Sequence, residues 1–153
     1  MQRPADSLAE EYAAMHRLHA LLEQEQSALT GGAIDALPEL INAKAHLIAQ
    51  IAALADARHK RLADAGLDAS EESMQRWIDS SGAPDEKQHW TDLLQLAQTV
   101  KEQNRLNGLI INKHMQINQQ TLNIFEGAAA GNSFYGPDGQ SSIKTNTRKF
   151  GAV

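Results

Sequence analysis

The first hydrophobic pattern of the chain predicts a helix over residues 7–30. An apolar residue returns every seven positions, which lays one narrow apolar seam along the helix. Ser7 followed by Glu10 predicts a capping box at its start. Gly31 and Gly32 predict its end, since glycine readily takes the left-handed conformation that helix ends favour. The seam consists of Leu8, Met15, Leu22 and Leu29.

A second, wider apolar stripe predicts a helix over residues 35–65. Pro38 falls in its first turn, where the missing N–H costs nothing. Gly66 followed by Leu67 predicts a glycine stop with its hydrophobic contact. The stripe is wider than a two-stranded coiled-coil seam, so we expect this helix to touch more than one neighbour. Its members are Ile34, Leu37, Leu40, Ile41, Leu47, Ile48, Ile51, Leu54, Ala55 and Leu62.

Two more helices follow. Residues 70–80 form a short one with Met74, Trp77 and Ile78 on its apolar side, and the loop at 80–84 breaks it. The last runs over residues 85–126, with Asp85 and Gln88 as the ends of a second capping box. At 1.5 Å per residue it is about 60 Å long, too long for a compact ball of this size.

Together these elements predict an all-α fold. We expect an elongated antiparallel helical bundle or coiled coil of three long helices plus one short helix, with a flexible C-terminal tail. No strand-like alternation interrupts the helical patterns. The expected division is a bundle domain at 1–130 and a recognition tail at 131–153.

The last helix changes character at residue 103. Charged residues become sparse, asparagine and glutamine take over, and apolar residues lie on most sides of the helix. Part of this surface is therefore expected to stay uncovered within one molecule. The amides either fix the register of a core helix, as a buried Asn does in coiled coils, or belong to a surface that awaits another amphipathic segment. Gly108 costs about 1 kcal/mol relative to alanine here and usually permits close approach of a backbone or a bend.

Composition and charge exclude several classes of function. The chain has 153 residues, no cysteine and a net charge of −5. Residues 127–153 carry one acidic and three basic side chains, a balance of +2, which leaves −7 on the rest. An acidic body binds nucleic acid poorly, because that affinity depends on neutralised phosphates. The first residues resemble no secretory signal, and no apolar run approaches the ~20 residues of a membrane span, so a cytoplasmic protein is predicted.

Candidate catalytic and metal sites are weak. His16 and His19 share a helix side with Glu23 nearby, but a solvated or half-buried helix surface explains them better. There is no HExxH motif and no convergent set of carboxylates. The loops at 80–82 and 136–139 have no partner base at a recognisable spacing. We therefore predict no enzyme activity, no metal and no cofactor.

The last residues carry aromatic side chains beside a turn. The sequence Gly136-Pro137-Asp138-Gly139 suits a tight turn, and Phe134 and Tyr135 come directly before it. A plain linker does not need an aromatic pair. Either these rings pack back on the end of the bundle, or the segment is a short recognition peptide with Tyr135 as its anchor.

Two stretches resemble the FlgN family of bacterial flagellar export chaperones. They are NSFYGPDGQ at 132–140 and LNGLIINKHMQINQQTLNIF at 106–125. The resemblance implies a cytoplasmic protein that is not an enzyme. It implies binding to the C-terminal regions of hook-associated proteins, the subunits that join hook and filament. Such a chaperone keeps these subunits from assembling early and delivers them to the flagellar type III export gate.

The resemblance also assigns residues. Phe134 and the tyrosine motif would dock to the cytoplasmic domain of the membrane export-gate protein, and Pro137 occupies a variable slot in that motif. The implied substrate-binding residues are Ile110, Ile117, Leu122, Ile124 and Phe125. The implied docking residues are Phe134, Tyr135, Gly136, Asp138, Gly139 and Gln140.

Two alternatives come from the residues themselves. The seven-residue seam in residues 7–30 is also typical of a structural coiled-coil protein that self-assembles, with the Ile110–Ile117–Ile124 track as its contact. A metal-binding bundle enzyme that uses His16 and His19 is the other.

Overall fold

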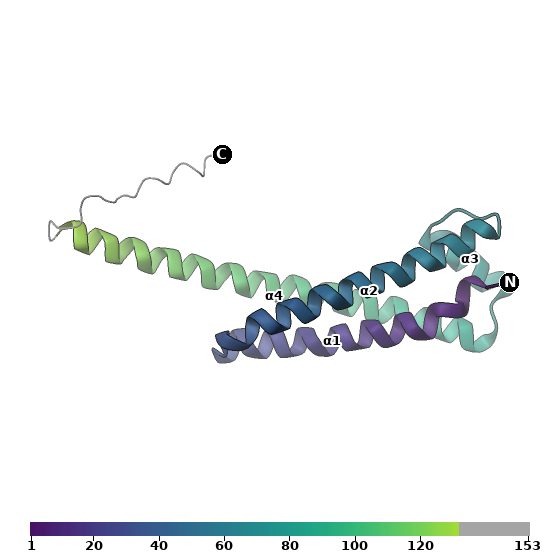
Figure 1. The fold of residues 1–153 in the computed structure, drawn as a ribbon, viewed down its shortest axis with the longest axis horizontal. Coiled ribbons are helices and arrows are strands. Elements are labelled where there is room, and N and C mark those ends of the chain that lie inside the picture. The colour runs from purple at the N-terminus through teal and green to yellow at the C-terminus, as the bar shows by residue number, and fades with distance from the viewer. Residues whose placement is uncertain (132–153) are drawn as a thin grey trace. The chain divides into compact units, whose positions relative to one another are not determined.

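The computed structural model describes residues 1–131, with side chains to residue 127. Its helices are α1 (Leu8–Gly31), α2 (Leu37–Asp64), α3 (Glu71–Ser81) and α4 (Pro84–Gly131) (Figure 1). Short 3-10 turns, η1 (Pro4–Ser7) and η2 (Ile34–Ala36), precede α1 and α2. No strand occurs in residues 1–131, and the predicted all-α fold is confirmed.

The chain divides into two units, Met1–Ile110 and Ile111–Val153, so that α4 begins in the first and continues into the second. The tail expected at 131–153 lies, from residue 132 on, outside the described residues. The predicted domain boundary at 130/131 stays a prediction.

In the first unit, α2 runs antiparallel to α1 and to the beginning of α4 (Figure 1). Glu11 near the start of α1 pairs with Arg58 near the end of α2, whereas Glu25 near the end of α1 pairs with Lys44. Asn107 of α4 also reaches Glu25, so α4 follows the direction of α1. The three long helices therefore pack up-down-up, with α3 in the connection between α2 and α4.

Two clusters of buried apolar side chains form the core of this unit. The first gathers around Trp90 and joins α1, α2, α3 and α4. The second lies further along α1 and is completed by half-buried residues of α2. The buried members of the first cluster are Ala5, Leu8, Leu62, Met74, Ile78, Trp90 and Leu93. The second cluster contains Leu18, Leu22 and Val100, with Met15, Leu47, Ile51 and Leu96 packed against it.

Both glycine stops are confirmed. Gly32 has φ 78° at the end of α1 and Gly66 has φ 81° after α2, and both values lie in the left-handed region that favours glycine. The Leu67 N–H donates to the Leu62 carbonyl at 2.9 Å, and the Leu67 side chain packs against the first core cluster. This is the hydrophobic contact expected of such an ending.

Both predicted capping boxes are wrong. Ser7 precedes α1 but caps no amide, because its buried hydroxyl donates to Glu11 at 3.0 Å and accepts from Arg61 at 2.9 Å. At the start of α4 the reciprocal contact lies two residues earlier than predicted, where the Ala83 N–H donates to the Glu86 carboxylate at 2.8 Å. The local sequence offers side-chain acceptors at more than one position near each helix start. The packing of the helices decides which of them forms a hydrogen bond.

A buried ion pair joins α1 to α2. The Arg58 Nε donates to both carboxylate oxygens of Glu11 at 3.1 Å, and both side chains are buried. The Arg58 guanidinium also donates to Glu71 of α3 at 2.7 Å and lies 5.0 Å from the ring centroid of Trp90. His59 contacts the same Glu71 oxygen at 2.9 Å. One cation thus holds α1, α2, α3 and α4 together by charge and by its position over an aromatic ring.

The carboxylate of Glu71 predicts a pH-dependent contribution to stability. Burial raises its pKa, but hydrogen bonds from Arg58 and His59 outweigh this, and the pKa is lowered overall from its ordinary 4.5. A lowered pKa means that the contribution is present above pH 4.5 and is lost as the pH falls through the folded-state value. Glu71→Gln is therefore expected to destabilise the protein at pH 7 by less than about 1 kcal/mol, since the side chain is largely exposed.

Urea denaturation of the wild type and of Glu71→Gln at pH 7 and at a pH near 3.5 measures this difference. The gap between the two proteins should shrink at the lower pH. A gap that stays constant between the two pH values would mean that the carboxylate charge contributes nothing.

The wide stripe of α2 is only partly covered. Lys44 contacts Glu25 of α1 and Asn104 of α4, so the expectation of more than one neighbour is confirmed. However, Ile34, Ile41 and Ile48 each remain about half exposed. The core therefore leaves the first three isoleucines of the predicted track only partly covered.

Candidate functional site

A buried amide anchors α4 at the end of the first unit. The Nδ2 of Asn107 donates to the Leu22 carbonyl at 2.9 Å and to the Glu25 carboxylate at 2.8 Å. Asn107 and Glu25 are both almost fully buried. A buried carboxylate is costly unless it is paired, and the Nζ of Lys44 donates to it at 2.9 Å. The three side chains hold α1, α2 and α4 in one register.

At Asn107 this cluster decides between the two interpretations of the asparagine and glutamine side chains of α4. Asn107 fixes register, as a buried Asn does in a coiled coil. The sequence pattern did not identify Glu25 or Lys44 as its partners. Two features of the sequence could have indicated this contact. An Asn occupies an apolar position of α4, and a Glu lies within the apolar seam of α1. Gly108, directly after Asn107, has nothing within 4 Å of the place that a Cβ would take, so the expected close approach of a backbone is absent among the described residues.

The second unit begins at Ile111, and its described part is helix α4 as far as Gly131. Large apolar side chains of this segment are exposed: Ile124 is 74% and Phe125 72% exposed, and Ile117 and Leu122 are about half exposed. These are four of the five predicted substrate-binding residues. The fifth, Ile110, ends the first unit and is partly buried.

The exposed side chains lie on one side of the helix together with the partly buried Ile111, and the polar Asn118 and Thr121 lie among them. At 100° per residue, six apolar residues fall within about half of the circumference, a narrower arc than the pattern first indicated. We call this set the α4 apolar face. It consists of Ile111, Met115, Ile117, Leu122, Ile124 and Phe125.

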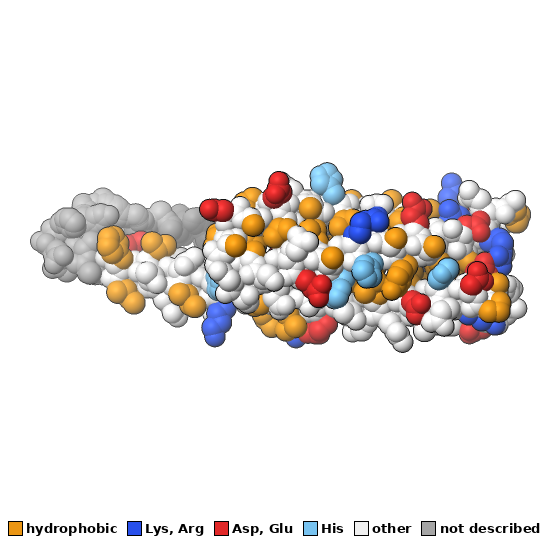
Figure 2. All heavy atoms as spheres, turned by 90° about the horizontal axis from the view of Figure 1, so that it is seen from below, with side chains coloured by type: hydrophobic (Ala, Val, Ile, Leu, Met, Phe, Trp, Pro, Cys, Tyr) orange, Lys and Arg blue, Asp and Glu red, His pale blue; other side chains and the backbone are white. Residues whose placement is uncertain are grey.

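The opposite side of the same segment is mostly uncharged and rich in amides. It carries the amides of Asn112, Gln116, Gln119, Gln120 and Asn123, and the Gln119 Nε2 donates to Asn123 at 3.0 Å. Between residues 111 and 127 the only charged side chains are Lys113 and Glu126. Figure 2 shows apolar side chains separated by uncharged ones on this part of α4, next to the grey residues.

An apolar helix side with amides behind it favours association with another amphipathic helix. Covering a large apolar side chain is worth about 1.5–3 kcal/mol relative to leaving it in water. The amides on the other side of the helix remain in contact with water. Because they carry no charge, they do not require a particular pattern of charges on the partner. A helix of this composition selects its partner by shape and apolar area.

Comparison with known proteins gives the family. Residues 1–143 match the family described as "FlgN protein". The chain belongs to the FlgN family. It is 26% identical over 143 residues to a "Flagella synthesis protein FlgN" of Yersinia enterocolitica, an alignment that covers 92% of this chain and 90% of the relative. A second relative of the same description, from Yersinia enterocolitica serotype O:8 / biotype 1B, has the same identity and coverage. No solved structure matches the chain.

The match to the FlgN family spans nearly the whole chain and extends well beyond the two stretches that carried the resemblance. The prediction made from residues 106–142 is confirmed, and so is the broad assignment to flagellum biogenesis and to a helical bundle. The docking residues implied by the resemblance, Phe134 to Gln140, lie outside the described residues and stay a prediction.

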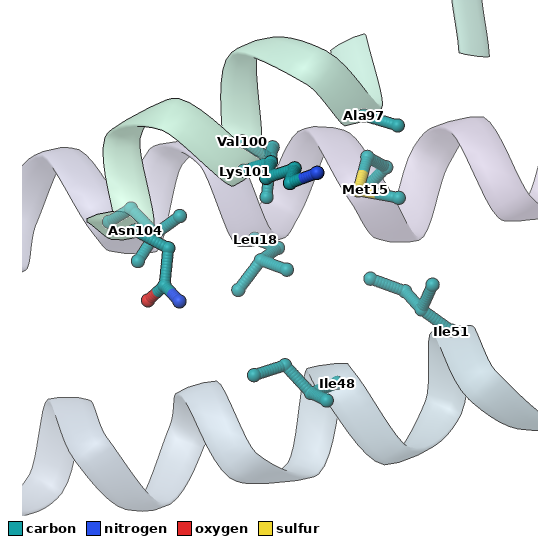
Figure 3. Close-up of a pocket in the computed structure, with 9 residues that line it drawn as sticks. Met15, Leu18, Ile48, Ile51, Ala97, Val100, Lys101 and Asn104 are labelled. Atoms are coloured by element: carbon teal, nitrogen blue, oxygen red, sulfur yellow. The ribbon is translucent and has the colours of Figure 1, made fainter. Parts of the chain in front are cut away.

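A groove in the first unit provides a second apolar surface in this FlgN-family chain. It has a volume of about 240 Å³ and is lined by residues of α1, α2 and α4. In Figure 3, Ile48 and Ile51 of α2 face Leu18 of α1 across it. Its lining residues are Met15, Leu18, Leu22, Ile48, Ile51, Ala97, Val100, Lys101 and Asn104.

The candidate metal ligands His16 and His19 both lie on α1. His16 is exposed and lies 6.2 Å from the Tyr12 ring, and His19 is partly buried. Among the described residues, no group of three or more His, Asp or Glu side chains could hold a metal ion. No described helix combines the length and the apolar composition that a membrane span requires.

Proposed function

We propose that this chain is a cytosolic flagellar export chaperone that binds the C-terminal regions of hook-associated proteins. The observation that carries the proposal is the α4 apolar face, a run of exposed apolar side chains on a helix with hardly any charge. Membership of the FlgN family and the relatives' description as flagella synthesis proteins support it. The chaperone would prevent premature assembly of these subunits and deliver them to the type III export gate.

The cargo that fits such a surface is an amphipathic helix. Subunit ends that assemble outside the cell must hide an apolar stripe until then, and a second apolar helix side covers it. Within the α4 apolar face we assign substrate contact to Ile117, Leu122, Ile124 and Phe125. Ile110 would extend the contact toward the first unit. Because the cargo must be held before it is exported, the chaperone acts in the cytosol.

Docking to the export gate is assigned to a separate segment. The proposed division places the bundle at 1–130 and the recognition tail at 131–153. Within the tail, Tyr135 would be the anchor, followed by the turn around Pro137. A segment that orders only on binding gives up conformational entropy, which lowers its affinity per contact area and favours release. Release is required of a chaperone that hands over its cargo.

Tyr135→Ala is expected to abolish delivery but not cargo binding. In a strain that lacks the gene, the wild-type chain should restore secretion of hook-associated proteins and motility. The Tyr135→Ala chain should restore little of either, because the anchor ring is lost, while it still co-purifies with the cargo. Secretion by immunoblot and swimming in soft agar measure the result. Normal secretion with Tyr135→Ala would contradict the docking role, and normal secretion without the gene would contradict the chaperone function.

A structural scaffold is the second candidate, because the exposed Ile117 and Ile124 of α4 also suit self-assembly. Sedimentation distinguishes the two. A stable higher oligomer that forms through α4 and excludes cargo would favour the scaffold.

A further inference from the structure

One seam of side chains runs along α4, because positions spaced alternately by three and four residues fall on the same side of a helix. In the first unit this seam faces the core, where Trp90, Leu93 and Val100 are buried. Asn107, its last position in that unit, is buried too. The same spacing continues in the second unit and passes through the middle of the α4 apolar face. Its positions there are Ile111, His114, Asn118, Thr121 and Phe125.

The middle of the α4 apolar face is therefore polar at three positions. The Thr121 hydroxyl donates to the Ile117 carbonyl at 2.9 Å, so its hydrogen bond is formed within the helix. The side chains of His114 and Asn118, one turn apart, have no hydrogen-bond partner among residues 1–127. A cargo helix that lies on the α4 apolar face would cover both of them. A covered polar group without a hydrogen bond destabilises the complex, so the cargo must supply a partner.

Asn107 indicates which partner suits this seam. Its Nδ2 donates to the carboxylate of Glu25 in α1 at 2.8 Å, although that carboxylate is almost fully buried. Asn118 offers the same Nδ2 donor, and His114 offers a ring N–H one turn away. Side chains four residues apart on a helix are neighbours. Two donors at this spacing match the two oxygens of one carboxylate.

From these observations we propose that His114 and Asn118 determine which cargo the α4 apolar face accepts. The cargo is an amphipathic helix whose apolar side carries one aspartate or glutamate that accepts hydrogen bonds from both side chains. This inference rests on the proposed function and adds a chemical requirement to selection by shape and apolar area. Glu126, the acidic residue of this segment, lies eight positions beyond Asn118, about 12 Å along the helix, and does not oppose a carboxylate there. An apolar helix without an acceptor leaves both donors covered and unpaired and is rejected.

Calorimetric titration at pH 7.5 with a C-terminal segment of a hook-associated protein tests the requirement. His114→Leu combined with Asn118→Leu should weaken binding more than about tenfold, even though the face becomes more apolar, because the cargo carboxylate is then covered without donors. The matched control is Gln116→Leu combined with Gln120→Leu, an exposed pair one turn apart outside the α4 apolar face. Its cargo affinity should stay within about threefold of the wild type. Circular dichroism confirms that both double variants are helical.

Changes in the cargo identify the carboxylate. Each aspartate and glutamate of the cargo segment is replaced singly by leucine. One of these segments should bind the wild-type chain more than about tenfold more weakly than the unchanged segment does. The same segment should bind the His114→Leu/Asn118→Leu chain about as tightly as the two unchanged partners bind each other, since both sides of the contact are then apolar.

Three outcomes would overturn the proposal. If the His114→Leu/Asn118→Leu chain binds the unchanged segment as tightly as the wild type does, the two side chains do not select the cargo. If no cargo carboxylate shows the reversal, the partner is not an acidic side chain. In both cases the wild type still binds its cargo, so the proposed function stands. A folded wild-type chain that binds no cargo segment would remove the proposed function, and this inference with it.

Discussion

Arg58→Met is expected to destabilise the protein by about 3–5 kcal/mol. The substitution keeps the apolar stem of the side chain but removes the guanidinium that lies over the Trp90 ring, and it leaves the Glu11 carboxylate buried without its cation. An uncompensated buried charge is among the most costly defects that a single substitution creates. Urea unfolding monitored by circular dichroism measures the change in the free energy of unfolding.

Two further variants locate the cause. Glu11→Leu combined with Arg58→Met should recover most of the lost stability, since replacement of a whole buried pair by apolar side chains is often neutral. Arg105→Met removes the exposed ion pair with Glu102 and should leave the free energy of unfolding almost unchanged, because water screens such pairs. If the double variant were less stable than Arg58→Met alone, the buried charge would not be the source of the loss.

Ile124→Gln combined with Phe125→Gln is expected to weaken cargo binding about a hundredfold or more. Both side chains are largely exposed in the free chain, so the fold does not depend on them. If cargo covers them, each contributes about 1.5–3 kcal/mol, and every 1.4 kcal/mol is a factor of ten in the dissociation constant. Glutamine preserves helix propensity, which separates a loss of contact from a loss of helix. Calorimetric titration with a C-terminal segment of a hook-associated protein measures the effect.

The matched control changes the opposite side of the same turns. Gln119→Ala combined with Asn123→Ala removes the amide pair that lies behind the α4 apolar face. Cargo affinity should then stay within about threefold of the wild type. Equal losses in the two double variants would mean that the helix, and not its apolar face, is what the cargo requires.

Helix order and most helix ends followed from the sequence because they depend on local chemistry. Apolar spacing located α1 to α4, and the glycines after α1 and α2 end those helices at positive φ. Start signals were less decisive. Ser7 is a typical cap residue, but its hydroxyl bonds to Glu11, one turn further along α1, and to Arg61, which the packing of α2 on α1 brings to it. A side chain that could cap a helix end forms other hydrogen bonds when a charged partner is buried beside it.

Long-range polar contacts could not be predicted. Glu11 and Arg58 are 47 residues apart, and Glu25 and Asn107 are 82 apart. On a helical pattern, a glutamate within an apolar seam is indistinguishable from a surface glutamate until its partner helix is placed. The exposure of Ile34, Ile41 and Ile48 was missed for the same reason, since seven-residue spacing marks a face without saying what covers it.

The candidate site, too, was predicted only in part from the sequence. The sequence predicted that part of α4 would stay uncovered, and Ile117, Leu122, Ile124 and Phe125 are exposed. The sequence pattern placed apolar residues on most sides of this helix, whereas the α4 apolar face occupies only about half of its circumference. The pattern did not identify the buried Asn107, which fixes the register of the helices near the end of the first unit.

The most direct test of the central claim is calorimetric titration of the wild-type chain with a C-terminal segment of a hook-associated protein from the same organism. A chaperone of this kind should give saturable binding near one cargo segment per chain. The heat should vanish in the Ile124→Gln/Phe125→Gln variant and persist in the Gln119→Ala/Asn123→Ala variant. No binding by folded wild-type protein to a folded, soluble cargo segment would contradict the claim and leave the scaffold as the better account of the same exposed residues.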